Sequence, residues 1–345
     1  MEKKYGRIVG WGSYVPEKIL TNYDLEKVID TTHEWIVQRT GIHERRVVAP
    51  EETTATMSTN AANRAIESAG ILAEDIDLII LATSTPDYLA PSVASQVQFM
   101  IGADAPAFTL MTGCTGFVYG INIAQQFIET GVYKTILLIG AELLSRFVDW
   151  NDRGTCVLFG DGAGAVIIQA SHQPSGVLGF DMGSDGTNSD AIIRPGGGSA
   201  RPLTAESMAA GEQYLKMNGR EVFKFATRVV GPSCQRALAQ TSLTLDEIDW
   251  IVPHQANLRI IQSAARSMGV PLEKFIVTVD RFANTSAASI PIAFVDGLSS
   301  GKIKPTDTIL LASFGAGLTW ASAVVQLVPQ NVPVQEERLV AEFAD

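Results

Sequence analysis

Cys114 is the side chain of this sequence that is best placed to act as a nucleophile. It lies in the motif Met111-Thr-Gly-Cys-Thr-Gly-Phe, between an extended apolar run and a segment with apolar residues at helical spacing. A thiol at the N-terminus of a helix faces free backbone N–H groups and the positive end of the helix dipole, which stabilise the thiolate at neutral pH. An isolated cysteine can also be a small, buried packing residue. Cys114 is therefore a candidate nucleophile that needs partners from elsewhere in the chain.

His254 and Asn284 are the candidate partners of Cys114. His254 follows Trp250-Ile-Val-Pro and precedes a helical pattern, so it lies beyond the carboxyl end of a strand, where α/β sheets bind their ligands. Asn284 lies where a turn leads into a helix. Each alone has a structural alternative, a hydrogen-bonded loop histidine or a capping asparagine. Together the three side chains predict a Cys/His/Asn site for acyl transfer.

An internal duplication relates Cys114 to Asn284. The motif Asp75-Ile-Asp-Leu-Ile-Ile resembles Glu247-Ile-Asp-Trp-Ile-Val, and each is followed at similar spacing by Cys114 or Asn284. A glycine comes 17 residues after Cys114 and again 17 residues after Asn284, and an apolar strand follows in both halves. Such ordered matches are typical of a tandem repeat. If a pseudo-twofold axis relates the halves, both residues converge on one central site.

Strand-like and helix-like segments alternate along the chain. This alternation predicts an α/β fold with a mostly parallel sheet covered by helices. The first half carries 15 residues more than the second around 147–159, in a loop where a binding function would be added. The expected strands are 78–83, 135–140 and 308–313, and the expected helices are 56–69, 116–130, 219–239 and 258–268.

Composition indicates a soluble globular enzyme and excludes several other classes. Of the 345 residues, 46% are hydrophobic and 18% are charged, and the net charge of −11 disfavours binding to nucleic acid or to an anionic membrane. The uncharged run 105–128 is interrupted by polar residues and is expected to be buried core, not a membrane span. No leader peptide is evident, so we expect a cytoplasmic location. The three cysteines are expected to be reduced, and their spacing predicts no metal site.

Two glycine clusters have different expected roles. Gly160-Asp-Gly-Ala-Gly departs from the dinucleotide-binding spacing and leads into a strand, so we expect close backbone packing there. Phe314-Gly-Ala-Gly follows a strand and could turn a backbone N–H toward the sulfur of Cys114. With the amide of Cys114, that N–H would form an oxyanion hole.

The sequence from about 7 to 327 resembles the β-ketoacyl-acyl carrier protein synthase III family of the thiolase superfamily. The resemblance implies a duplicated five-layered α-β-α-β-α fold, usually homodimeric, that begins fatty-acid synthesis. It implies a thiolase-like half with the Cys nucleophile at 1–175, a second half with the His and Asn at 176–328, and an acidic C-terminal extension at 329–345 of unknown role. It rests on residues 30–42, Gly113-Cys-Thr-Gly-Phe, Asp152-Arg-Gly-Thr, Phe159-Gly-Asp-Gly-Ala-Gly, residues 216–224, Pro253-His-Gln-Ala-Asn, Asn284-Thr-Ser-Ala-Ala-Ser and Phe314-Gly-Ala-Gly-Leu-Thr-Trp.

The resemblance also implies the roles of the site residues. Cys114 would take an acyl group from acyl-coenzyme A, which is a substrate, and no cofactor is implied. His254 and Asn284 would hold the thioester carbonyl of malonyl-acyl carrier protein while its carboxylate leaves as CO₂. The backbone amides of Cys114 and Ala316 would bind the oxyanion, provided that the dihedral angles at 316 accept alanine in place of glycine.

Coenzyme A contacts are implied at the mouth of the site. In the family pattern, Trp35 and Arg153 enclose the adenine, with Thr31, Arg39 and Asn257 nearby. A flat indole and a guanidinium are suited to stacking on a purine. The alternative for Trp35 is packing in the core.

A docking surface for the acidic carrier protein is assigned to Lys224, Gln255, Arg259 and Arg266, of which family members use the positions of Lys224 and Arg259. The basic residues Lys216, Arg220, Lys224 and Arg228 recur every four positions and would form a stripe on one helical face. Such like-charge pairs are unfavourable unless a partner binds them, although a solvated face stays an alternative.

Ala90 departs from the family pattern. It lies in Pro86-Asp-Tyr-Leu-Ala-Pro-Ser, where many relatives carry a Phe whose ring closes the acyl tunnel of the partner subunit. Ala90 is expected to leave room for a longer acyl chain. The alternative is that other side chains fill this space and acetyl-CoA stays the preferred primer.

Three other functions compete with this interpretation. A papain-like hydrolase would carry family-specific residues around the Cys that are absent here. A relative that joins acyl groups to other acceptors in secondary metabolism would use the same three residues. The third is an inactive scaffold, which the intact set of Cys114, His254 and Asn284 disfavours.

Overall fold

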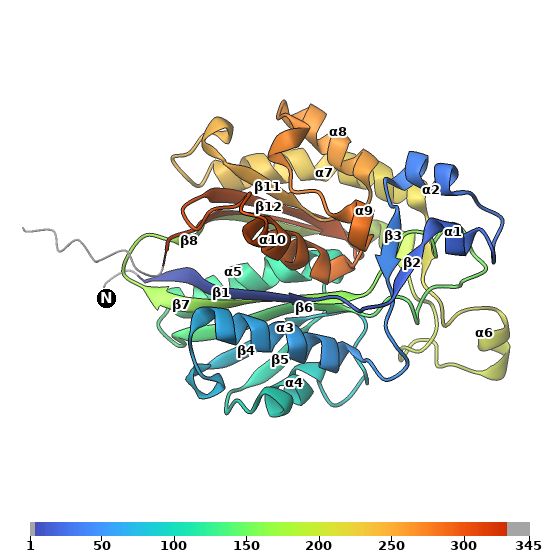
Figure 1. The fold of residues 1–345 in the computed structure, drawn as a ribbon, viewed down its shortest axis with the longest axis horizontal. Helices are drawn as coiled ribbons and strands as arrows, with labels where there is room; N and C mark the ends of the chain where they lie inside the picture. Colours follow the sequence, from blue (N-terminus) through green and yellow to red (C-terminus); the bar gives the residue numbers. More distant parts are fainter. Residues whose placement is uncertain (1–3, 330–345) are drawn as a thin grey trace, which may run out of the picture.

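The chain folds into five layers that alternate between helices and sheets (Figure 1). The computed structural model describes residues 4–329, so the predicted extension lies outside the described residues except for Pro329. From one face to the other, the layers are α3 (Thr54–Ala69) with α4 (Val93–Ile101), a five-stranded sheet, α5 (Gly116–Glu129) with α10 (Ser289–Ser299), a four-stranded sheet, and α7 (Gly219–Leu238) with α8 (Leu258–Met268).

Both sheets are mixed. The first has the order β1 (Tyr5–Tyr14), β7 (Gly162–Ser171), β6 (Thr135–Glu142), β4 (Leu78–Ala82), β5 (Ala107–Leu110), and the second has the order β8 (Gly176–Ser184), β13 (Thr319–Gln326), β12 (Thr308–Gly315), β11 (Trp250–Pro253). Among the strands of these two sheets, the parallel pairs are β4 with β5, β4 with β6, and β11 with β12. The expectation of a mostly parallel sheet is therefore wrong, because β6 to β7 and β12 to β13 are joined by a loop or turn without a crossover helix, so each pair runs antiparallel.

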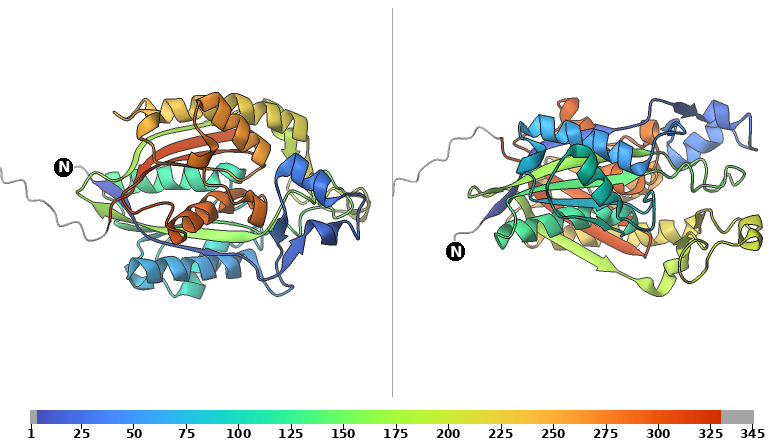
Figure 2. Two further views of the ribbon diagram at one scale, coloured as in Figure 1. Left: turned by 45° about the horizontal axis from the view of Figure 1, so that its top comes forward. Right: turned by 90° about the horizontal axis from the view of Figure 1, so that it is seen from below.

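The two sheets confirm the duplication. The order β1-β7-β6-β4 of the first sheet corresponds to β8-β13-β12-β11 of the second, and α5 and α10 occupy the middle layer side by side (Figure 2). The second sheet has no full counterpart of β5, and a single parallel bridge between Ile251 and Phe275 stands at that place. The first sheet uses residues 5–171 and the second 176–326. The division into two domains itself stays a prediction.

Short elements connect the layers and surround one end of the sheets. The short helices are α1 (Asn22–Leu25), α2 (His33–Thr40), α6 (Ala205–Ala209) and α9 (Val279–Phe282), and the short strands are β2 (Ile19–Thr21), β3 (Glu44–Arg46), β9 (Ile192–Ile193) and β10 (Lys216–Met217). The 3-10 segments are Ala73–Asp75, Gly113–Thr115, Gly186–Ala191, Leu245–Glu247, Leu272–Lys274 and Ser286–Ala288, of which Gly186–Ala191 is kinked at Asn188.

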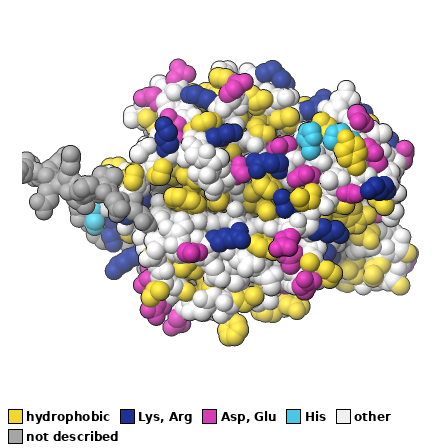
Figure 3. Space-filling model, viewed as in Figure 1, with side chains coloured by type: hydrophobic (Ala, Val, Ile, Leu, Met, Phe, Trp, Pro, Cys, Tyr) yellow, Lys and Arg dark blue, Asp and Glu magenta, His cyan; other side chains and the backbone are white. Residues whose placement is uncertain are grey.

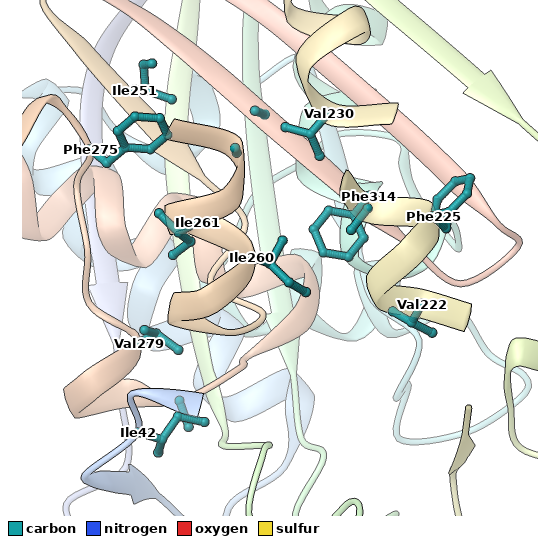
Figure 4. Packing of buried hydrophobic residues seen from close by; sticks show 14 of the residues in the cluster. Ile42, Val222, Phe225, Val230, Ile251, Ile260, Ile261, Phe275, Val279 and Phe314 are labelled. Carbon is teal, nitrogen blue, oxygen red and sulfur yellow. The ribbon is translucent and has the colours of Figure 1, made fainter. Parts of the chain in front are cut away.

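The core fills the spaces between the layers. Figure 4 shows Phe314 of β12 between Ile260 of α8 and Phe225 of α7, and all three are buried in one cluster.

The uncharged run 105–128 forms β5 and α5, and none of the described helices is long and apolar enough to cross a membrane. On the face seen in Figure 3, acidic and basic side chains are interspersed.

The glycines of β6 and β7 allow α10 to approach the first sheet closely. A Cβ atom at Gly140 would lie 2.3 Å from the carbonyl oxygen of Ala287, and one at Gly164 would lie 2.7 Å from Cβ of Pro291. Only residues without a Cβ fit at such distances. The packing role expected for the cluster around Gly162 is confirmed.

Candidate active site

One cavity of about 810 Å³ holds the three candidate catalytic residues. Cys114, His254 and Asn284 all line it, although 30 to 170 residues separate them in the sequence. The loop between β6 and β7 also lines it through Leu144, Arg153 and other residues. The extra residues of the first half therefore lie at the site, as their position in a loop predicted.

Cys114 lies in the 3-10 turn Gly113–Thr115, directly before α5. The turn is fixed from the other half of the molecule, where the hydroxyl of Ser313 on β12 donates a 2.7 Å hydrogen bond to the carbonyl oxygen of Cys114. Burial raises the pKa of the Cys114 thiol to about 12, and a hydrogen bond with Ser286 acts in the opposite direction. Desolvation of the sulfur therefore opposes the stabilisation of the thiolate that the helix N-terminus provides, and the predicted thiolate stabilisation stays a prediction. The thiol has to lose its proton during the reaction.

His254 comes directly after β11 and is 2% exposed. Its Nδ1 is 2.7 Å from Oγ of Ser289, the first residue of α10, and its ring meets Phe314 edge-on. Burial lowers the pKa of His254 to about 3, so the ring is neutral near pH 7. Ser289 Oγ accepts from the amide of Gln255 at 3.3 Å and can donate its own proton to Nδ1, and in that tautomer the ring proton is on Nε2. His254 is thus a neutral hydrogen-bond donor.

Asn284 is held by the loop that precedes β7. Its amide donates to the carbonyl oxygen of Leu158 at 2.9 Å, and its carbonyl oxygen accepts from the amide of Gly160 at 3.1 Å. Its side-chain Oδ1 accepts from the amide of Ser286 at 2.8 Å, which leaves Nδ2 as the donating end of the side chain. Asn284 therefore supplies a second neutral donor.

The backbone of the Phe314-Gly-Ala-Gly segment lies against the Cys114 turn. A Cβ atom at Gly315 would lie 2.8 Å from the amide nitrogen of Cys114, and one at Gly113 would lie 3.2 Å from the amide nitrogen of Ala316. Among the described non-glycine residues, positive φ angles occur only at Ala283 and Ser286, so alanine at 316 is not strained. This arrangement is compatible with the predicted oxyanion hole, whose function stays a prediction.

Four of the five residues assigned to coenzyme A line the cavity, namely Trp35, Arg39, Arg153 and Asn257. The guanidinium carbons of Arg39 and Arg153 lie 4.7 Å and 5.2 Å from the centre of the Trp35 ring. Trp35 also packs against the core, so the alternative interpretation describes part of its role. Thr31 does not line the cavity.

The residues assigned to carrier-protein docking separate into three groups. Lys224 and Arg259 line the cavity, where Lys224 pairs with Glu221 at 2.8 Å. Arg266 is exposed at the end of α8 and does not line it. The assignment of Gln255 to the docking surface is wrong. Gln255 is 1% exposed, and its side chain forms hydrogen bonds with four backbone groups, so it cannot contact a docked protein.

The prediction that Lys216 belongs to the basic stripe is wrong. Lys216 belongs to β10, because α7 begins only at Gly219, where the side chain of Asn218 accepts from the amide of Glu221. The stripe therefore consists of Arg220, Lys224 and Arg228, of which the first two line the cavity.

Ala90 is exposed and lies outside the cavity. A second space of about 540 Å³ adjoins the first, since both are lined by Gly113, Leu144, Leu215 and Ala316. Met111 and Phe147 give this space an apolar wall close to Cys114. Ala90 does not line it within one chain, so its predicted role depends on a partner subunit and stays a prediction.

Sequence reasoning missed three polar residues of the site, namely Glu142, Ser286 and Ser289. The two serines are within the Asn284-Thr-Ser-Ala-Ala-Ser motif, so this motif could have indicated them. Glu142 ends a buried strand, and nothing in the local sequence distinguishes it from a structural carboxylate.

Cys156 and Cys234 are free and buried, and no group of metal-ligating side chains occurs within residues 4–329.

Comparisons with known proteins agree on one family. The model of the 3-oxoacyl-[acyl-carrier-protein (ACP)] synthase III family matches residues 108–186, and that of its C-terminal part matches residues 238–327. The chain is 48% identical over 323 residues to the beta-ketoacyl-[acyl-carrier-protein] synthase III of Roseiflexus sp. (strain RS-1), which covers 93% of this chain and 98% of the relative. It is also 48% identical to synthase III 1 of Bacillus anthracis over 92% of this chain and 98% of that protein.

Solved structures show the same relationship. The 3-oxoacyl-[acyl-carrier-protein] synthase III from Aquifex aeolicus VF5 has a TM-score of 0.86 and 42% identity, covering 93% of this chain and 99% of that chain. The priming beta-ketosynthase from the R1128 polyketide biosynthetic pathway has a TM-score of 0.88 and 34% identity, covering 95% of this chain and 97% of that chain.

Proposed function

The chain belongs to the family of 3-oxoacyl-[acyl-carrier-protein] synthases III, and from this premise we propose that it condenses an acyl-CoA primer with malonyl-acyl carrier protein through an acyl group on Cys114. It is an acyl-transferring condensing enzyme that begins fatty-acid synthesis. The observation that carries the proposal is one cavity that combines a thiol with two neutral hydrogen-bond donors, His254 and Asn284.

The first step loads the primer. The adenine of acyl-CoA stacks at Trp35 between Arg39 and Arg153, and the acyl thioester reaches Cys114. The sulfur of Cys114 attacks the thioester carbonyl, and the backbone amides of Cys114 and Ala316 bind the oxyanion. The bond to the sulfur of coenzyme A breaks, and coenzyme A leaves as the thiol after taking up a proton.

The second step forms the carbon–carbon bond. His254 Nε2–H and Asn284 Nδ2–H donate to the thioester carbonyl oxygen of the malonyl group. As CO₂ leaves, the electron pair of the broken bond forms an enolate, and these two donors stabilise its oxygen. The enolate carbon attacks the acyl thioester on Cys114, and the sulfur of Cys114 leaves. A neutral imidazole suits this role because its N–H donor is present near neutral pH, where burial keeps the ring uncharged.

Separate assays of the half-reactions test these roles. In His254→Ala and Asn284→Ala, decarboxylation of malonyl-acyl carrier protein is expected to fall by about 10² to 10³. Loading of Cys114 by acyl-CoA, measured by intact-protein mass spectrometry, should stay near the wild-type rate. Equal loss in both steps would contradict the assignment and favour His254 as a base for the thiol.

The carrier protein docks at the rim of the cavity. Lys224 and Arg259 lie there, and the ring of Phe223 lies 6.0 Å from the guanidinium carbon of Arg259. An acidic carrier protein would meet these cations next to the opening that its malonyl group has to enter.

The enzyme acts as a homodimer through the side of α4 and β5. Tyr88, Leu89, Phe99 and Met111 are 61% to 83% exposed, and β5 is the edge strand of the first sheet. A second copy would cover these apolar side chains and the free strand edge. Sedimentation of wild type and Phe99→Glu tests this interface: the wild type is expected to be a dimer and the variant a monomer.

The free thiols of Cys114, Cys156 and Cys234 support a reducing, cytoplasmic location.

A further inference from the structure

A buried carboxylate lies behind the nucleophile. Glu142 is the last residue of β6 and is 0% exposed. It accepts hydrogen bonds from the hydroxyl of Thr85 at 2.7 Å, the amide of Ser84 at 3.0 Å, and the hydroxyl of Ser286 at 3.1 Å, with a longer contact to Thr83. All these donors are neutral, so no cation compensates its charge among its hydrogen-bond partners in residues 4–329. Such burial is costly for a carboxylate with a packing role alone.

Ser286 connects this carboxylate to Cys114. Its hydroxyl hydrogen-bonds the thiol of Cys114 and also lies 3.1 Å from Oε1 of Glu142. Ser286 has a φ of 47°, which non-glycine residues rarely adopt, and its amide is held by Oδ1 of Asn284. A strained residue at a reacting group is typical of positions that the surrounding structure fixes for function.

We propose that Glu142 accepts the proton of Cys114 through the hydroxyl of Ser286 when the thiol is acylated. The S–H bond of Cys114 breaks as a new O–H bond forms on Ser286, and the original proton of Ser286 moves to Oε1 of Glu142. The serine is unchanged, the thiol has become a thiolate, and the carboxylate has become an acid. This inference rests on the proposed function, in which Cys114 carries the acyl group.

The proton returns when the product forms. The coenzyme A thiolate takes its proton from solvent, so Glu142 keeps its own proton during the acyl-enzyme stage. When the enolate attacks and the C–S bond to Cys114 breaks, the sulfur leaves as a thiolate and recovers the proton from Glu142 through Ser286. Over one turnover the enzyme is restored, and one solvent proton is consumed for each CO₂ released.

Basicity favours Glu142 over His254 as the acceptor. Burial raises the pKa of Glu142 to about 7, whereas burial lowers the pKa of His254 to about 3. The hydrogen-bonding groups that face Glu142 come from the segment after β4 and from the turn before α10, and none of them titrates near neutral pH. The titratable group that interacts with Glu142 is Cys114, in the turn before α5. A carboxylate that ionises near neutral pH is suited to act as a general base at that pH.

Alkylation of Cys114 by iodoacetamide tests the relay without any acyl substrate. In wild type, the rate should rise with pH and level off above about pH 7, as Glu142 ionises. In Glu142→Gln this inflection should be absent, and acyl-CoA loading should fall by about 10² to 10⁴. Ser286→Ala removes the bridging hydroxyl and leaves the carboxylate of Glu142 in place. The inflection should also be absent in this variant, which provides a test if Glu142→Gln folds poorly.

Asp161→Asn is the matched control. Asp161 is also a buried carboxylate, bonded by Ser145 and by the amide of Val48, but it has no hydrogen bond to Ser286 or Cys114. This variant should keep the inflection. An inflection near pH 7 that persists in Glu142→Gln or Ser286→Ala overturns the relay. If alkylation follows the expected pattern but acyl-CoA never loads Cys114, the relay holds and the proposed function fails.

Discussion

Acidification provides a direct test of the neutral state of His254. Burial lowers the pKa of this ring from 6.5 to about 3 in the folded protein, whereas the unfolded chain titrates near 6.5. As the pH falls below 6.5, the unfolded state binds a proton that the folded state excludes. His254 therefore contributes stability above pH 6.5, and this contribution is lost as the pH falls from 6.5 toward 3.

The expected size of this loss follows from the two pKa values. At pH 5 the ring is almost fully protonated in the unfolded chain and almost fully neutral in the fold. The free energy of unfolding should then be lower than at pH 7 by about 2 kcal/mol from this one group. Such a loss is a large fraction of the stability of an ordinary domain.

Urea unfolding of wild type and His254→Gln at pH 7 and pH 5 measures this contribution. The wild type should lose about 2 kcal/mol more than the variant between the two pH values. The pKa of Glu142 is raised, so its effect on the free energy of unfolding has the opposite sign. Glu142 contributes stability below pH 4.5, and this contribution is lost as the pH rises through about 7. Because both proteins contain Glu142, its contribution cancels when their losses are compared. An equal loss in both proteins would refute the lowered pKa and the neutral-donor role derived from it.

Three further predictions concern the substrates. Cys114→Ala should form no acyl adduct in mass spectrometry, and an adduct on another cysteine of that variant would show that the nucleophile is misassigned. Charge reversal at Lys224 or Arg259 should raise KM for malonyl-acyl carrier protein with strong salt dependence and leave acyl-CoA loading near normal; unchanged carrier-protein kinetics would exclude this docking surface. Ala90→Phe should lower kcat/KM for octanoyl-CoA relative to shorter primers, since three more buried methylenes are worth about 2.4 kcal/mol. An acetyl-CoA preference that is the same in wild type and Ala90→Phe would show that position 90 does not set chain length.

Local patterns in the sequence were enough to predict an α/β fold and to select Cys114, His254 and Asn284 as candidates, whereas the five-layered arrangement was implied by the family resemblance. The spacing of apolar residues and glycines marked α5, α7, α8 and the main strands, since helix ends and strand periods are local properties. The repeated spacing around Cys114 and Asn284 indicated the duplication, because equivalent positions in a repeat keep equal distances along the chain.

The tertiary structure decided which groups are buried and which atoms face each other. Gln255 is polar and follows His254 directly, yet it is buried and bonds the backbone, because the chain around Ile276 and Thr278 packs over it. Burial also raises the pKa of the Cys114 thiol, and this burial comes in part from segments distant in sequence, such as the end of β12 with Ser313. Glu142 and Ser286 are 144 residues apart and meet only because the two halves pack on each other. Burial and long-range contact are collective properties of the packed chain, so a local pattern does not contain them.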